Sequence, residues 1–164
     1  MIMSKLCHNL YKEFCKILPK GHYEMSMIFK LHPQLAKDCE VVGELEVNLV
    51  LLLNKSQLPW FILVPKIAHA TELYELDKEI QQNIMEESRV FSEAIMAFYK
   101  GDKLNLATIG NVVPQLHIHH IVRYKNDPCW PDVVWGNLPP LSYEKSAKEQ
   151  RILQIKKILA RIKS

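Results

Sequence analysis

The chain of 164 residues has the length of one domain, because most domains contain roughly 100 to 200 residues. Hydrophobic residues make up 48% of it and charged residues 24%. This composition is typical of globular proteins and excludes a disordered tail, a collagen-like repeat and a disulfide-dominated miniprotein. The formal net charge is +3, from 21 basic and 18 acidic residues, so composition gives no reason to expect a nucleic-acid partner.

Neither a membrane segment nor a disulfide framework is indicated. The longest apolar stretch covers residues 47–53, whereas a membrane span needs about 20 residues. The first residues lack the apolar core of a signal peptide. Four cysteines lie far apart without a C-x-x-C pair, which is typical of reduced thiols. We therefore expect a cytoplasmic protein that does not bind a membrane.

The spacing of apolar residues predicts three helices. A short helix is expected over residues 9–18, ended by Pro19. A long amphipathic helix is expected from a cap at Asp77 to a stop at Gly101. A last helix is expected after a cap at Ser142, because apolar residues recur there every three or four positions.

Strand-like segments occur mostly in adjacent pairs. Residues 47–53 and 60–64 are apolar, are separated by a polar turn and have prolines only at their ends, which favours an antiparallel hairpin. Residues 103–110 and 115–124 form a second pair, and residues 25–31 give a weaker strand signal. Because strands are paired instead of alternating with helices, we predict an α+β fold with an antiparallel sheet.

The segment over residues 115–124 holds three of the seven histidines. Alternate residues of a strand share a face, so Gln115, His117, His119 and Arg123 lie together, opposite a mostly apolar face that suits the core. Three hypotheses fit this row: a solvated polar face, a metal site, or a nucleophilic histidine aimed at an anionic phosphate. Two imidazoles are too few ligands for zinc, whereas neutral imidazole is available at pH 7 because its free pKa is about 6.5.

The sequence Q-L-H-I-H-H-I over residues 115–121 resembles the His-φ-His-φ-His-φ-φ signature of the histidine triad (HIT) superfamily. Residues 51–54 and 61–66 are similar to its nucleoside-binding hairpin, and the Gly110-Asn111 step is similar to its phosphate-side turn. The resemblance covers about residues 24–136. It is closest to a bacterial branch often described as diadenosine-tetraphosphate-hydrolase-like, with Gln115 at the first triad position.

The resemblance implies a HIT-like fold. In that fold an antiparallel sheet of about five strands carries one long helix and flanking terminal helices. We expect one such domain over residues 1–164, with a helical extension over about 141–164. A homodimer is implied as well, with a nucleotide or dinucleoside polyphosphate as substrate. We expect no cofactor, metal, membrane or nucleic acid as partner.

The resemblance also implies residue roles in a nucleotide hydrolase or transferase. The middle triad residue, His117, attacks the α-phosphorus of a dinucleoside polyphosphate or nucleoside phosphoramidate and forms a nucleotidyl-histidine intermediate. His119 and Gln115 support it, and His120, off the pattern, faces the core or the dimer seam. The nucleotide contacts are Asn54 at the ribose and Gly110, Asn111 and Asn105 at the phosphates, although Asn105 equally suits a surface strand position.

Two other functions stay open at this point. One is a nucleotide-binding or sensing module with little turnover, and the other is a metal-dependent enzyme with His117 and His119 as ligands. Arg123 lies six residues beyond His117, roughly 20 Å at the strand rise. We therefore expect it to attract longer polyphosphates or to support the dimer.

Overall fold

The computed structural model describes residues 29–163, so the helix predicted over 9–18 and most of the weak strand over 25–31 lie outside the described residues. In chain order, the elements are α2 (Pro33–Asp38), β1 (Cys39–Glu44), β2 (Asn48–Leu53), β3 (Trp60–Pro65), the 3₁₀ turn η1 (Leu73–Glu75), α3 (Lys78–Tyr99), β4 (Lys103–Ala107), β5 (Ile118–Arg123) and α4 (Lys145–Ile162). No helix within this part of the chain is both long and apolar enough to cross a bilayer.

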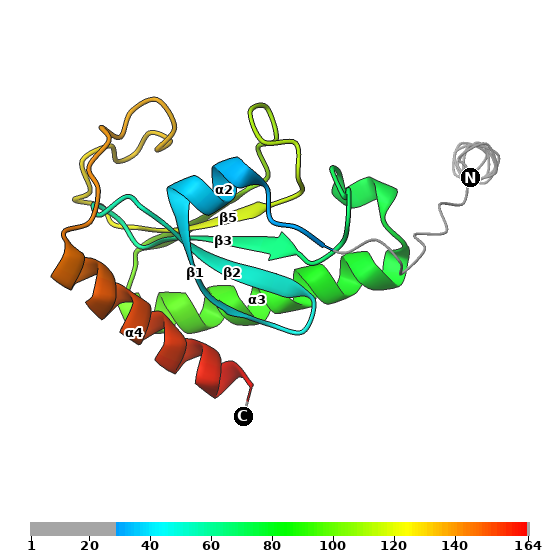
Figure 1. Ribbon diagram of the computed structural model, residues 1–164. Helices are drawn as coiled ribbons and strands as arrows, with labels where there is room; N and C mark the ends of the chain where they lie inside the picture. Colours follow the sequence, from blue (N-terminus) through cyan, green and yellow to red (C-terminus); the bar gives the residue numbers. More distant parts are fainter. Residues whose placement is uncertain (1–28, 164) are drawn as a thin grey trace, which may run out of the picture.

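The five strands form one sheet in the order β1-β2-β3-β5-β4, and every neighbouring pair is antiparallel. This confirms the predicted α+β fold, the β2–β3 hairpin and the pairing of β4 with β5. Helix α3 runs along one face of the sheet, α2 lies on the opposite face, and α4 crosses near α3 and β1 (Figure 1).

Both faces of the central strands are covered, because their residues alternate between two cores. In β3, Phe61 and Leu63 pack in the core under α3, whereas Ile62 and Val64 pack in the second core beneath α2 and the 126–140 loop. This is the two-residue period of a strand. Every residue of β3 and of β5 is therefore buried, and the hypothesis of a solvated polar face on β5 is wrong.

The ends of α3 lie at the predicted cap and stop, whereas the start of α4 differs from its predicted cap. Helix α3 begins directly after Asp77, but the Asp77 side chain makes no capping hydrogen bond. At its other end Lys100, with φ 53°, takes the left-handed conformation, while Gly101 lies against Val122, where a Cβ atom would clash. Helix α4 starts after Glu144, so the predicted cap at Ser142 is wrong.

Strand β5 is shorter than predicted and begins at Ile118, so Gln115 and His117 precede it. Its pairing with β3 ends at Leu63 opposite Ile118, and its pairing with β4 ends at Ala107 opposite His119. Beyond these points the backbone N–H of Leu116 donates to the carbonyl of Ala70 at 2.8 Å. This bond holds the His117 segment against the chain that leaves β3.

Candidate active site

The backbone fixes the tautomer of His117 at the start of β5. Its Nδ1 lies 2.7 Å from the carbonyl oxygen of Gln115. A carbonyl can only accept, so Nδ1 carries the proton and donates, which leaves the lone pair on Nε2. The residue is only 5% exposed, but it lines a cavity of about 500 Å³. In the neutral ring, the Nε2 lone pair in such a place is a candidate nucleophile.

The cavity beside His117 has a polar lining. Hydroxyl, amide and backbone groups gather there from the loop after β3, from the β4–β5 connection and from the start of β5. The polar contributors are Thr71, Thr108, Gly110, Asn111 and Gln115, together with the acidic side chain of Glu72. The structure thus brings Gly110, Asn111 and Gln115, all predicted site residues, to the same cavity as His117.

His119 has the opposite tautomer. The indole Nε1 of Trp60 lies 2.9 Å from His119 Nδ1, and an indole N–H can only donate. Nδ1 is therefore bare and Nε2 carries the proton. The ring of His119 also meets the edges of Trp60 and Trp135, and its centroid lies 4.9 Å from that of His117. His119 thus presents an N–H donor next to the candidate nucleophile.

Burial keeps His119 uncharged. The residue is 8% exposed, and desolvation, followed by the charges of His117 and His120, lowers its pKa from 6.5 to about 3. Protonation would also remove the acceptor that Trp60 uses. At neutral pH His119 can donate a hydrogen bond, but it cannot act as a charged acid.

His120 faces the core under α3, as predicted for a residue off the motif. Its Nδ1 donates to the carbonyl of Ile118 at 3.0 Å, and its Nε2 lies 2.9 Å from Ser88 Oγ on α3. Burial lowers its pKa to about 4. Both ring nitrogens are satisfied within the protein, so His120 holds the sheet to α3 and takes no part in the cavity.

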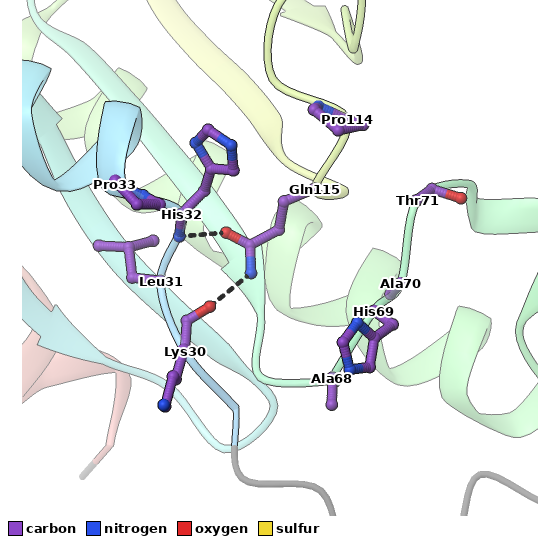
Figure 2. Close-up of a pocket in the computed structure, with 10 residues that line it drawn as sticks. All are labelled: Lys30, Leu31, His32, Pro33, Ala68, His69, Ala70, Thr71, Pro114 and Gln115. Atoms are coloured by element: carbon purple, nitrogen blue, oxygen red, sulfur yellow. Dashed lines mark hydrogen bonds between the residues drawn. The ribbon is translucent and has the colours of Figure 1, made fainter.

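The side chain of Gln115 is already engaged with the backbone. Its Oε1 accepts from the N–H of His32 at 2.8 Å, and its Nε2 donates to the carbonyl of Lys30 at 2.9 Å (Figure 2). These are the two bonds that a neighbouring strand would make. The amide at the first triad position thus docks the segment before α2 beside His117, and this contact uses one of the two N–H groups of Nε2.

Arg123 is neutralised inside the protein. Its guanidinium donates to both carboxylate oxygens of Asp127, at 2.6 and 3.0 Å, and to Asn105 Oδ1 at 2.8 Å. Both side chains of the ion pair are 2% exposed. Burial alone would raise the pKa of Asp127, but hydrogen bonds from Arg123 and two backbone N–H groups lower it to about 2. The expectation that Arg123 attracts an anionic substrate is therefore wrong.

Two predicted nucleotide contacts lie elsewhere. Asn105 is opposite Ile121 and is held by Arg123. Asn54 is exposed just after β2, where its Oδ1 accepts from the N–H of Tyr143 at 3.1 Å. In the sheet register the level of His119 falls at Leu51, so Asn54 lies towards the Arg123 end, away from the cavity.

Two features of the site are not among the residues predicted for it: Trp60, and the contact of Gln115 with Lys30 and His32. Trp60 and Ile62 are alternate residues on β3, and the register places them opposite Ile121 and His119. The alternation of side chains along the predicted hairpin could therefore have indicated that Trp60 lies on the same face of the sheet as His119. The Gln115 bonds join residues 83 and 85 positions apart, and no local pattern indicates them.

The donor arrangement does not favour a metal between His117 and His119. A metal at Nε2 of His119 would need that nitrogen deprotonated, while Trp60 already requires a bare Nδ1. Over residues 29–163, no group of three or more His, Cys, Asp or Glu side chains is placed to hold an ion.

Comparison with known proteins identifies the family. The model of the HIT domain matches residues 34–126, more than half of the chain. A histidine triad protein from Marinobacter aquaeolei VT8 is 43% identical with a TM-score of 0.80, covering 83% of this chain and 99% of its own. A second, from Bradyrhizobium japonicum, is 36% identical with a TM-score of 0.77, covering 80% and 98%. No curated protein matches. The chain belongs to the HIT domain family.

Proposed function

We propose that the protein hydrolyses a nucleotide conjugate at its α-phosphorus through a covalent intermediate on His117. The observation that carries this proposal is the pair of opposite tautomers, with a bare Nε2 on His117 and an Nε2–H on His119. Membership of the HIT family supports it, because these proteins bind and hydrolyse nucleotides. A nucleophile and a neutral donor side by side suit attack on a phosphate whose oxygens gain charge.

The reaction has two displacements. In the first, the Nε2 lone pair of His117 forms a P–N bond while the bond from phosphorus to the leaving group breaks, and its electron pair departs with the leaving group. The proton stays on Nδ1 throughout and is donated to the Gln115 carbonyl, whose oxygen stabilises the positive charge that the ring acquires. In the second, water attacks phosphorus, the P–N bond breaks, and the nucleoside monophosphate leaves with the proton released to solvent.

The low pKa of His119 narrows the choice of leaving group. His119 has a pKa near 3, so it cannot deliver a proton from a charged ring at neutral pH. A polyphosphate departs as an anion and needs no proton, whereas the amine of a phosphoramidate must be protonated to leave. Dinucleoside polyphosphates are therefore the substrates we propose, ahead of nucleoside phosphoramidates.

A homodimer is the assembly we propose, formed through β4. This strand is at the edge of the sheet, and Leu106 on it is 47% exposed. Unpaired edges of this kind readily add a strand from another chain. Leu106→Lys should convert a dimer into a monomer in sedimentation experiments, while Lys103→Gln, at an exposed position on the same strand, serves as the control. A wild-type monomer at micromolar concentration would contradict this assembly.

The test of the proposed function is turnover of a nucleotide panel in the presence of EDTA. We expect diadenosine tetraphosphate to be cleaved faster than an adenosine phosphoramidate, and we expect the chelator to leave the rate unchanged. Tight binding without turnover would favour a sensing module instead. Loss of turnover in EDTA would favour a metal-dependent enzyme. Either result would overturn the proposal.

A further inference from the structure

A second cavity adjoins the His117 cavity on the other side of Gln115. It has a volume of about 760 Å³, within the range of small-molecule sites, and both cavities share Gln115 and Thr71 in their lining. One wall is the Lys30–Pro33 segment, and the facing wall is the 68–71 segment that leaves β3 (Figure 2). A ligand that reaches His117 therefore meets a second compartment next to it.

Gln115 builds the wall of this second cavity. Its amide holds the backbone of Lys30 and His32, while its own carbonyl holds His117 Nδ1. Gln115 thus orients the ring of His117 and also holds the Lys30–His32 wall in place. A ligand has little access to His117 from the side of His119, because Trp60 and Trp135 cover His119, which is only 8% exposed.

The lining of the second cavity differs in character from that beside His117. Its walls are mainly apolar, from Leu31, Pro33, Ala68, Ala70 and Pro114, with the basic side chains Lys30, His32 and His69 among them and no acidic residue. Such a lining suits a flat ring system joined to an anionic chain. The His117 cavity is more polar and suits the phosphate that is attacked.

We propose that the second cavity binds the leaving half of a two-armed substrate, a nucleoside attached through a polyphosphate chain. The attacked nucleotide occupies the His117 cavity, and the chain passes Gln115 to place the second nucleoside between residues 30–33 and 68–71. This inference deepens the proposed function and rests on it for the identity of the attacked phosphate. It assigns to the enzyme a preference for substrates with two bulky ends.

Filling the second cavity tests this proposal through binding. Ala68 is half-buried in its wall, so Ala68→Phe occupies the space of the second ring. Ala160→Phe, at an exposed position on α4, is the matched control. We expect Ala68→Phe to weaken calorimetric binding of a methylene-bridged, non-hydrolysable diadenosine tetraphosphate by about 10-fold or more, the size of a lost ring contact. AMP should change less than about 2-fold.

A second variant tests the second cavity if circular dichroism shows that Ala68→Phe does not fold. Lys30→Glu reverses a charge at an exposed position and should weaken the diadenosine tetraphosphate analogue, but not AMP. Equal effects on both ligands, or no effect on either, would overturn the second site.

Turnover of adenosine 5′-phosphorofluoridate distinguishes failure of the second-cavity proposal from failure of the proposed function. Its leaving group is fluoride, so its cleavage depends on His117 and needs no second cavity. If the wild-type protein does not cleave this compound, the proposed function is wrong. The changes in affinity for the diadenosine tetraphosphate analogue and for AMP still test the second cavity.

Discussion

Replacing Trp60 by phenylalanine isolates the hydrogen bond that sets the tautomer of His119. The change removes the indole N–H that donates to Nδ1 at 2.9 Å and keeps an aromatic ring at a position that is 4% exposed. The buried Nδ1 then has no donor, which costs about 1–3 kcal/mol in the free energy of unfolding. The ring can respond by moving its proton to Nδ1, and Nε2 then has no hydrogen to donate.

The expected consequence is a fall in kcat of about 10²- to 10³-fold, the usual effect of losing one transition-state donor. Burial is the largest cause of the low pKa of His119, and it persists in the variant. The pH–rate profile should therefore keep its shape while its height falls. Trp135→Phe is the control, because Trp135 touches the His119 ring edge-on and should change kcat little.

Two measurements check this reasoning. Long-range ¹H–¹⁵N spectra of the wild type should show His119 protonated at Nε2 and bare at Nδ1, with His117 the reverse. Steady-state kinetics on both tryptophan variants should then separate their effects on kcat. A wild-type proton on His119 Nδ1, or an unchanged kcat in Trp60→Phe, would refute the assignment.

Acidification should destabilise the protein through its buried histidines. In the folded state the pKa values of His119 and His120 are about 3 and about 4, so both stay neutral while the unfolded chain gains protons below its ordinary value of 6.5. The free energy of unfolding is highest above that pH and falls as pH decreases, by about 2–3 kcal/mol for each ring at about pH 4.5. A free energy of unfolding in urea that does not change with pH would contradict this. Arg123→Ala should cost about 3–5 kcal/mol in urea unfolding because it strands Asp127, whereas Arg123→Met with Asp127→Leu should recover most of that loss. A cost below about 1 kcal/mol for Arg123→Ala, the value of an exposed pair, would show that the ion pair is not buried in solution.

Strong local patterns made much of the fold predictable. The β2–β3 hairpin and α3 have long, regular apolar periods, and both appear close to where the sequence predicts them. Strand β1 was missed because it includes Glu40, Gly43 and Glu44, and because an irregularity between Val41 and Gly43 breaks the alternation. Pairing with β2 and packing against α4, rather than local pattern, account for this strand, since Gly43 lies opposite Val50 and close to Leu159.

The site was predictable only as far as it follows one strand. The alternation that groups His117 with His119 survives in the structure, and the Gly110-Asn111 turn joins them through a short connection. Asn54 could not be placed, because its distance from the histidines depends on register across β2, β3 and β5. The bonds of Trp60 to His119 and of Gln115 to Lys30 connect residues 59 and 85 positions apart, so only the folded chain reveals them.

The most direct test of the central claim is to identify the residue that carries the nucleotide. Wild-type protein is mixed with labelled diadenosine tetraphosphate, quenched rapidly, and analysed by intact mass spectrometry and peptide mapping. The account predicts an adenylyl group on His117, no adduct in His117→Ala, and in His119→Ala the same adduct formed about 10²- to 10³-fold more slowly. An adduct on His119, or one that survives in His117→Ala, would contradict the assignment of His117 as the nucleophile.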